Sequence, residues 1–286
     1  MEFRNILFPV DFSEACEAIA PHVRSLCERF QASLTLAHFI YIPPISYGAL
    51  DASGPFLWPV QQFTENAEQR LRAFSAKFFP GLDPRIFVRE GDPGACISDI
   101  ATSHPFDLIM MPTHGYGRFR ALLLGSVAAK TLHDATCAVW TAAHKAKQRP
   151  AEPWKRILCA IDSNAEGATL LRNAAKLSEN GKISVRVIHV VPSSTPAEDP
   201  AVDSGFSEFL VRSAETAVAQ LQATAGTAFE VRVKMGVIPE VVRDEAVDWN
   251  ADIVLIGRGV LPRFAGQFRS RAHSIIRTMP CPVLSV

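Results

Sequence analysis

Ile6-Leu7-Phe8-Pro9-Val10-Asp11 is a short apolar run, close to the start of the chain, that ends in a carboxylate. It returns at residues 157–162 as Ile157-Leu158-Cys159-Ala160-Ile161-Asp162. Short apolar runs of this kind favour strands that are buried inside a parallel sheet. A strand pattern that recurs so far along the chain indicates that the unit around it is repeated as well.

Other landmarks recur in the same order around these two strands. The matching pairs are His38 and His189, Gly91 and Gly236, Asp107–Met110 and Asp252–Leu255, and Cys137–Val139 and Cys281–Val283. The chain has 286 residues, which is enough for two domains of ordinary size. We therefore expect two copies of one domain, residues 1–143 and 154–286, joined by a polar linker that contains prolines.

Strand and helix patterns alternate in both copies. Strands are expected over Asn5–Val10, Ser33–Ile40, Arg85–Arg89, Leu108–Met111 and Ala138–Thr141, and again over Arg156–Ile161, Ser184–Val191, Phe229–Lys234, Ile253–Ile256 and Val283–Val286. Helices are expected after the N-caps Ser13 and Asp92 and over Phe63–Phe78, Ser126–His133, Ala165–Leu177, Ser207–Ala223, Pro239–Val247 and Ser270–Thr278. Pro21 predicts a kink or a late start in the first helix. The alternation predicts an α/β fold in which each domain has a parallel five-stranded sheet covered by helices on both faces.

The last strand of each copy is apolar to its end. Ala138–Thr141 and Val283–Val286 would each leave an exposed sheet edge unless something covered them. Pairing these two strands with each other would remove both edges. The sequence therefore predicts an internal pseudo-dimer of the two domains.

Composition narrows the classes of function. The 29 Lys+Arg balance the 29 Asp+Glu, which argues against a general nucleic-acid-binding surface. No apolar run approaches the roughly 20 residues of a membrane-spanning helix, and the N-terminus does not have the layout of a signal peptide. None of the 6 cysteines belongs to a Cys-x-x-Cys pair, so we expect free thiols in a reducing cytoplasm.

Two segments that follow strands carry the chemical signals, because ligands of parallel sheets bind at the carboxyl ends of the strands. Asp11 either accepts a hydrogen bond from a ribose or a base, or shapes the turn into the next helix. The segment Met111–Ser126 contains glycines and a serine at a helix start, which together suit a polyphosphate, with Arg118 and Arg120 as added charge. The alternative is a glycine-rich loop that only leads into a helix.

The whole chain resembles a tandem universal stress protein. ATP-binding members of that family carry Gly-x-x-Gly, nine residues, then Gly-[Ser/Thr], and this chain has Pro112-Thr113-His114-Gly115, residues 116–124, then Gly125-Ser126. Phe8-Pro9-Val10-Asp11-Phe12-Ser13, Leu36-Ala37-His38-Phe39 and Gly91-Asp92-Pro93 also match the family pattern. The resemblance implies a Rossmann-like, flavodoxin-like fold for each domain, and it implies pairing through the last strands as in the dimers of the family.

The resemblance also implies a nucleotide site in the first domain, for ATP or ADP with or without Mg²⁺. Asp11 would hold the ribose or the adenine, and Gly115, Gly125 and Ser126 would bind phosphates through backbone N–H groups and the hydroxyl. Pro112 departs from the motif, because proline has no N–H to donate. Carried over by position, the contacts are Pro9, Val10, Asp11, Phe39, Met111, Pro112, His114, Gly115, Gly125, Ser126 and Val127.

The second domain departs further from the motif. Gly257 keeps the first glycine, but Val260 and Ser270 fall on the later glycines and Arg271 falls on the Ser/Thr position. We expect this domain to bind ATP weakly or not at all. Its basic residues either hold an anion through their side chains or form a solvated loop; they are Arg258, Arg263, Arg269 and Arg271.

The remaining signals are weaker. His38 and His189 are expected to pack at the carboxyl edge of the sheet, and neither a metal cluster nor a catalytic set is recognisable by spacing. The aromatic connection Tyr41–Pro59 either forms a lid over a nucleotide or a partner surface, or caps the edge of the core.

Three hypotheses of function follow. The first is a cytoplasmic stress-response protein that binds ATP or ADP in its first domain and uses the binding to signal or to bias assembly. The second is a nucleotide-independent scaffold for a protein or a small apolar ligand, and the third is a slow ATP hydrolase. An adenine nucleotide, an unidentified protein and a second tandem chain are the partners considered, and neither a nucleic acid nor a membrane is expected.

Overall fold

The computed structural model describes residues 1–41, 60–115, 124–143, 151, 154–178, 181–193, 204–258 and 266–286, with the backbone alone at 165, 204 and 266–271. The strands are β1 (Asn5–Pro9), β2 (Ser33–Ile40), β3 (Arg85–Glu90), β4 (Leu108–Pro112), β5 (Ala138–Ala142), β6 (Arg156–Ala160), β7 (Ser184–Pro192), β8 (Glu230–Gly236), β9 (Ile253–Ile256) and β10 (Val283–Ser285). The helices are α1 (Glu14–Phe30), α2 (Val60–Phe78), α3 (Pro93–Ser103), α4 (Ser126–Asp134), α5 (Ala165–Leu177), α6 (Ser204–Ala225), α7 (Ile238–Asp248) and α8 (Gly266–Thr278).

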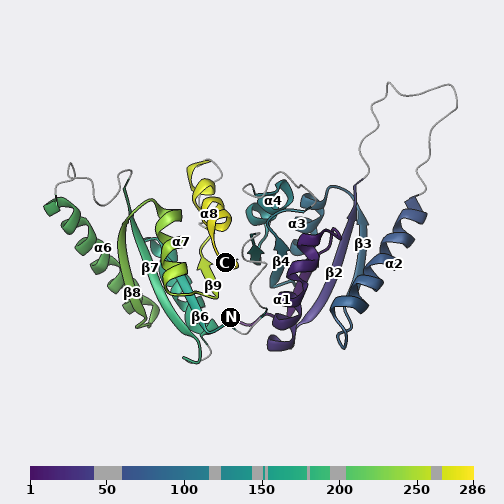
Figure 1. Ribbon diagram of the computed structural model, residues 1–286, viewed down its shortest axis with the longest axis horizontal. Coiled ribbons are helices and arrows are strands. Elements are labelled where there is room, and N and C mark those ends of the chain that lie inside the picture. Colours follow the sequence, from purple (N-terminus) through teal and green to yellow (C-terminus); the bar gives the residue numbers. More distant parts are fainter. Residues whose placement is uncertain are drawn as a thin grey trace, which may run out of the picture.

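All strands belong to a single sheet with the order β3-β2-β1-β4-β5-β10-β9-β6-β7-β8. Within each half the strands are parallel, and both halves have the 3-2-1-4-5 order of the Rossmann type. Figure 1 shows the two halves side by side, with both chain termini near the centre. The predicted α/β fold with two parallel five-stranded units is confirmed.

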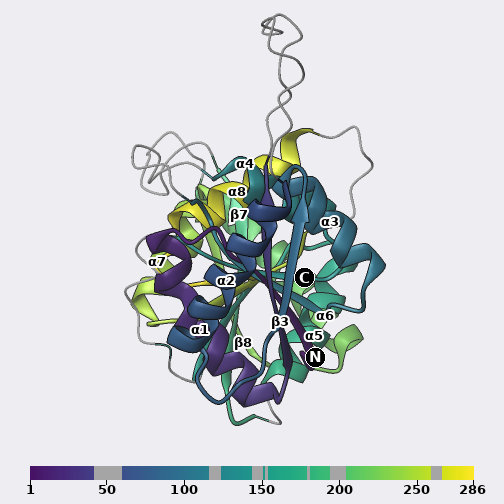
Figure 2. The same ribbon diagram turned by 90° about the vertical axis from the view of Figure 1, so that its right-hand side faces the viewer.

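Helices cover both faces of the sheet. Residues of α1, α2, α5 and α6 pack into one apolar core, and residues of α3, α4, α7 and α8 pack into the other. Figure 2 looks at the first half from its outer edge and shows α1 and α3 on opposite sides of the sheet. Strands that are buried on both faces read as continuous apolar runs, which is the pattern that the repeat displayed.

The first helix contradicts one of the two alternatives expected for Pro21, the late start. α1 begins at Glu14, directly after its N-cap Ser13, and contains Pro21 within its length. A late start is therefore wrong. An interior proline costs about 3 kcal/mol through the lost N–H and the ring clash, and the burial of Ile19, Ala20 and Val23 on the sheet offsets that cost.

The two halves meet where β5 and β10 pair antiparallel, as the sequence predicted. The register joins Val283 to Thr141 and Leu284 to Trp140, and the Thr141 hydroxyl donates to the Val283 carbonyl at 3.5 Å. Arg29 of α1 adds a contact with the second half, because its guanidinium carbon lies 5.0 Å from the ring centre of Trp154. The division into domains 1–143 and 154–286 stays a proposal, and the linker segments 144–150 and 152–153 lie outside the described residues.

An aspartate ties the first strand of each half to its fourth. The Asp107 carboxylate, just before β4, accepts from the backbone N–H groups of Arg4 at 2.8 Å and Asn5 at 3.2 Å. Asp252, just before β9, accepts in the same way from Lys155 at 2.7 Å and Arg156 at 2.8 Å. The repeat therefore extends to a side chain that holds two backbone donors at the amino ends of the central strands.

A buried carboxylate distinguishes the second half. Glu245 on α7 is only 3% exposed, and it accepts from Arg186 of β7 at 2.9 Å and pairs with Lys234 of β8 at 2.6 Å. The Arg186 guanidinium also lies 4.6 Å from the Trp249 ring. Burial on its own would raise the pKa of Glu245, but the Lys234 ammonium and the Arg186 guanidinium outweigh it and hold the pKa below its ordinary value.

The structure bears on two expectations from the composition, one about membrane-spanning helices and one about the cysteines. No described helix is both long enough and apolar enough to cross a membrane. All six cysteines are free thiols, and Cys137 is the one that is only partly buried.

Candidate functional site

A cavity opens at the carboxyl ends of β1 and β4. β1 pairs with β2 on one side and β4 on the other, so this is where the strand order reverses and where ligands of such sheets bind. The cavity has a volume of about 330 Å³, within the size range of small-molecule sites. All eleven predicted site residues line it, and so do five that were not predicted as nucleotide contacts: Cys16, Pro93, Ile97, Thr113 and Ala128.

Asp11 shapes the turn into α1, which is one of the two roles that the sequence left open, and the contact with a ligand stays a prediction. Its Oδ1 accepts from the backbone N–H of Ser13 at 2.9 Å, which shapes the turn into α1. Phe12 between them has a left-handed backbone with φ 61°, a conformation that is uncommon outside glycine. The same Asp11 side chain lines the cavity. The carboxylate is therefore held by the turn at the position where a ligand would meet it.

Gly115 lies directly against this carboxylate. A Cβ built on Gly115 would collide with Oδ2 of Asp11, so any side chain there would have to displace the carboxylate. The second glycine of the motif therefore serves close approach, and what it approaches is another residue of the site.

His38 supports Asp11 from the neighbouring strand. Its Nδ1 lies 2.7 Å from the Val10 carbonyl, so this nitrogen carries the hydrogen and donates. Its ring packs on the Phe12 ring, with 4.8 Å between the ring centres. The guanidinium carbon of Arg70 lies 4.0 Å from the centre of the same Phe12 ring. Burial lowers the pKa of His38, so the imidazole is neutral at pH 7. Both neighbours of Asp11 are thereby fixed.

The amino end of α4 forms the opposite wall. Gly125 is the N-cap and Ser126 is the first helical residue, so the serine stands at the helix start, as expected, but does not cap the helix. The Gly125 N–H donates to the Thr113 carbonyl at 2.8 Å, which means that it is not available to a phosphate as the resemblance had implied. The next N–H groups, of Ser126, Val127 and Ala128, have no acceptor within the helix, and they carry the positive end of its dipole.

The comparisons with known proteins bear on the whole chain. A family model described as the Universal stress protein family matches residues 2–142 and, a second time, residues 153–286. The chain belongs to the universal stress protein family.

Individual relatives match one half or the whole. Universal stress protein A homolog 1 of Coxiella burnetii is 28% identical over 150 residues, covering 49% of this chain and 98% of the relative. A universal stress protein structure from Archaeoglobus fulgidus covers 99% of this chain and 96% of its own, with 21% identity and a TM-score of 0.67, which shows the common fold. Another from that organism, in complex with dAMP, covers 46% of this chain and 97% of its own, with 22% identity and a TM-score of 0.31.

Pro112 is the departure from the ATP-binding motif of the family that bears most on the site. It is the last residue of β4 and pairs with Ala142 of β5. The next residue, Thr113, directs its N–H to Ala142 at 3.1 Å. Because successive residues of a strand direct their amide nitrogens to opposite sides, the nitrogen of Pro112 faces the β1 side, where the cavity opens. The proline therefore removes one donor from the cavity wall.

Replacing Pro112 by glycine should restore that donor. If the cavity binds ATP, the affinity should rise by about threefold to tenfold, the range of one additional neutral hydrogen bond. Calorimetric titration of both proteins measures the change, and thermal unfolding checks that the variant retains its fold. An unchanged affinity in a folded variant would mean that this nitrogen does not reach the ligand.

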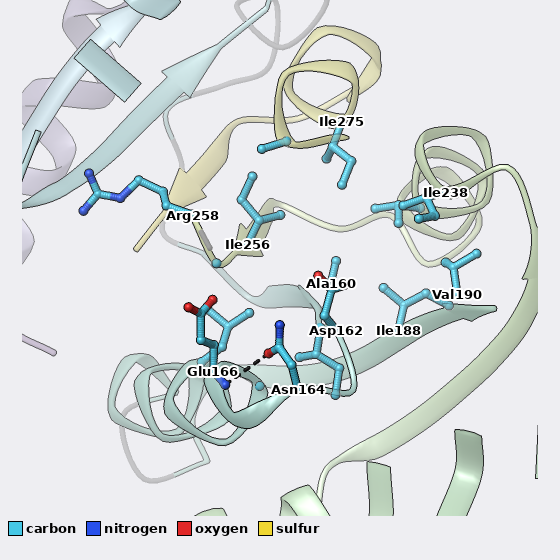
Figure 3. Close-up of a pocket in the computed structure, with 16 residues that line it drawn as sticks. Ala160, Asp162, Asn164, Glu166, Ile188, Val190, Ile238, Ile256, Arg258 and Ile275 are labelled. Carbon is cyan, nitrogen blue, oxygen red and sulfur yellow. Dashed lines mark hydrogen bonds between the residues drawn. The ribbon is translucent and has the colours of Figure 1, made fainter. Parts of the chain in front are cut away.

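The second half has a smaller cavity in the corresponding place, shown in Figure 3. Its volume is about 90 Å³, and Asp162 and Ile256 stand where the first half has Asp11 and Met111. Arg258 lines it, but its guanidinium donates to the carbonyl of Ala135 at the end of α4 in the first half. The side chain of Arg258 is therefore held at the seam between the halves and is not freely solvated, and the anion interpretation of the basic residues stays a prediction. The side chains of Arg263, Arg269 and Arg271 lie outside the described residues.

The remaining candidates from the sequence are the two histidines, a metal cluster, the lid segment and two arginines. His189 repeats His38, with its Nδ1 2.9 Å from the Ile161 carbonyl, so both histidines pack at the carboxyl edge as expected. Within the described ranges no group of three or more His, Cys, Asp and Glu side chains is placed to hold a metal ion. Residues 42–59, which carry the lid hypothesis, and Arg118 and Arg120 lie outside the described residues.

Proposed function

We propose that the chain is a stress-response protein that binds ATP or ADP in its first domain, residues 1–143. The observation that carries the proposal is the cavity of about 330 Å³, because all eleven residues that the family motif implies line this one space. The second domain, residues 154–286, has a cavity of about 90 Å³ and serves as a partner that does not bind the nucleotide.

The lining suits the parts of an adenine nucleotide. Val10, Phe39 and Met111 offer an apolar wall for the base. Asp11 presents a carboxylate to the ribose hydroxyls or the adenine amino group. The amino end of α4 offers backbone N–H groups and the Ser126 hydroxyl to the phosphates, where the helix dipole favours negative charge.

Nucleotide occupancy would act as a signal, or would bias assembly with a protein partner or a second tandem chain. The protein would act in the cytoplasm, where its free thiols stay reduced. Mg²⁺ would accompany the phosphates rather than occupy a protein site, because Asp11 is the carboxylate that the described residues bring to this cavity.

Calorimetry of ATP binding tests the proposal. We expect about one nucleotide per chain, and a loss of about tenfold or more in affinity in Gly125→Val. A Cβ at Gly125 would lie 3.2 Å from the Thr113 carbonyl oxygen and 3.4 Å from the Cα of His114, so the larger side chain has to shift this wall of the site.

Gly257→Val is the matched control, because a Cβ at Gly257 would meet no atom of the described residues within 4 Å. It should bind ATP like the natural protein. No heat at millimolar ATP, with an unchanged Tm, would contradict the proposal and favour the nucleotide-independent scaffold, since a ligand of the native state must stabilise it. Phosphate release that is lost in Asp11→Ala and Ser126→Ala would favour the slow hydrolase.

A further inference from the structure

One side chain of the second half reaches α4, the helix whose amino end forms a wall of the larger cavity. The guanidinium of Arg258, which follows β9, donates to the carbonyl of Ala135, the C-cap of α4. The backbone N–H of Arg258 donates to the Val286 carbonyl at 3.0 Å, so the backbone and the side chain of this residue are both held. Figure 3 shows the side chain extending away from the other labelled residues. One end of α4 thus lies at the cavity, and the other end is bound by the second half.

The helix α4 has few anchors of its own. It has 9 residues, and helices shorter than about 12–15 residues depend on tertiary contacts for their stability. Its buried residues are Ala128, Thr131 and Leu132, and its N-cap, Gly125, has no side chain with which to cap the helix. Within the described part of the chain the buried hydroxyl of Thr131 has no hydrogen-bond partner, which reduces what its burial contributes. The position of α4 therefore depends on contacts from outside the helix.

A cation suits the carboxyl end of α4, because the last carbonyls of a helix carry the negative end of its dipole. The basic side chains of its own last turns, Lys130 and His133, both contact the Asp134 carboxylate. Arg258 brings a positive charge to the same end from the other half. Burial lowers the pKa of Arg258, but a guanidinium still carries its charge at pH 7.

The repeat shows that this contact is particular to the second half. Thr113 follows β4 at the position where Arg258 follows β9, because Met111 corresponds to Ile256. The Thr113 hydroxyl donates to the Ala142 carbonyl at 3.3 Å, within its own half. With arginine in place of threonine, the side chain is long enough to cross the seam. The support therefore runs from the second half to the half that has the larger cavity.

We propose that Arg258 is a positioning residue for the nucleotide site of the first domain. By holding the carboxyl end of α4, it keeps the helix in the orientation in which the N–H groups of Ser126, Val127 and Ala128 meet the phosphates. The inference rests on the proposed function and deepens it. It gives the second domain a task in nucleotide binding that requires no nucleotide of its own.

Amide NMR of the full chain tests the proposal, with ATP and adenosine as probes. Arg258→Met removes the charge and the donors but keeps an unbranched side chain. We expect its affinity for ATP to fall by about threefold to tenfold, within the range that a cation at a helix terminus contributes. The affinity for adenosine should stay unchanged, because adenosine has no phosphate to meet α4. Without nucleotide, the amides of α4 should exchange with solvent faster than in the natural protein, since a helix with less support opens more often.

Arg277→Met is the matched control. Arg277 is an exposed arginine in the last turn of α8, the helix of the second half that corresponds to α4. Its substitution should change neither the affinity for ATP nor the exchange of the α4 amides. Arg258→Gln is a second neutral variant, for which the same results are expected as for Arg258→Met, and it keeps the test available if the methionine variant does not fold.

The salt concentration separates positioning from direct attraction of the phosphates to the charge of Arg258. The two ends of a nine-residue helix lie roughly 13 Å apart. Titrations at about 0.15 M salt, where the Debye length is about 8 Å, therefore screen that attraction. A selective loss of ATP affinity under these conditions reports on the position of α4.

Three results would overturn the inference. They are an unchanged affinity for ATP in the folded neutral variants, equal losses of affinity for ATP and for adenosine, and unchanged exchange of the α4 amides. A natural protein that binds no ATP would instead contradict the proposed function, and the role of Arg258 in nucleotide binding with it.

Discussion

Replacing Glu245 by alanine should destabilise the protein by about 3–5 kcal/mol, the range expected when one partner of a buried ion pair is removed. The change leaves the Arg186 guanidinium, which is largely buried, without one of its carboxylate partners, and it opens space beneath α7. Urea unfolding at pH 7 measures the loss. Glu230→Ala is the matched control, because Glu230 also pairs with Arg186, but with a side chain that is 47% exposed, where a pair contributes at most about 1 kcal/mol.

The stabilisation by Glu245 should also depend on pH in a defined direction. Since the pKa of Glu245 is lower in the folded protein, the carboxylate stabilises the fold above its ordinary pKa of about 4.5. The difference in stability between the natural protein and Glu245→Gln should be constant from pH 7 to about 4.5, and should then shrink as the pH falls through the folded pKa. Equal losses in Glu245→Ala and Glu230→Ala, or a difference that grows on acidification, would contradict this assignment.

Gly115→Ala should reduce the affinity for ATP by about 10- to 100-fold, the effect of losing a hydrogen bond to a charged group. The added methyl group would collide with Oδ2 of Asp11, while Oδ1 is held by the Ser13 N–H, so the carboxylate has to leave the position that the turn gives it. Calorimetry with ATP measures the loss, and the Tm without ligand should change little because the cavity wall is open to solvent.

Gly257→Ala makes the same substitution in the second domain, where the methyl group has space. It should bind ATP like the natural protein. Combining Gly115→Ala with Asp11→Asn adds a stricter condition. If Gly115 acts through Asp11, the glycine substitution should have little further effect once the carboxylate is gone. A full additional loss in the double variant would show that Gly115 contacts the nucleotide by itself.

The fold could be predicted from the sequence because its information is local and duplicated. The apolar runs at residues 6–10 and 157–161 each specify a buried strand, and their repetition gives the relation between the halves. The apolar ends of the last strands required a partner, and β5 and β10 provide it for each other. The cavity lining followed because motif residues after neighbouring strands meet at one edge of the sheet.

What could not be predicted depends on contacts between residues far apart in the chain. Arg258 lies in a basic segment, and no spacing in the sequence relates it to the Ala135 carbonyl, which it reaches across the seam between the halves. Glu245 reads as one more charge on an amphipathic helix until β7 and β8 bring Arg186 and Lys234 to it. The Gly125 N–H has its acceptor because the fold brings Gly125 back beside Thr113. Side-chain periodicity carries none of this information.

The antiparallel seam between β5 and β10 has a consequence for how the protein behaves in a mixture of its relatives. A dimer of separate subunits dissociates on dilution and can exchange subunits with any chain that has a compatible edge. Here the two halves are covalently joined, so their association is intramolecular and does not depend on the concentration of the protein. Their composition is also fixed, with each molecule carrying one copy of the larger cavity and one of the smaller. The two halves were therefore free to diverge without the risk of forming mismatched pairs.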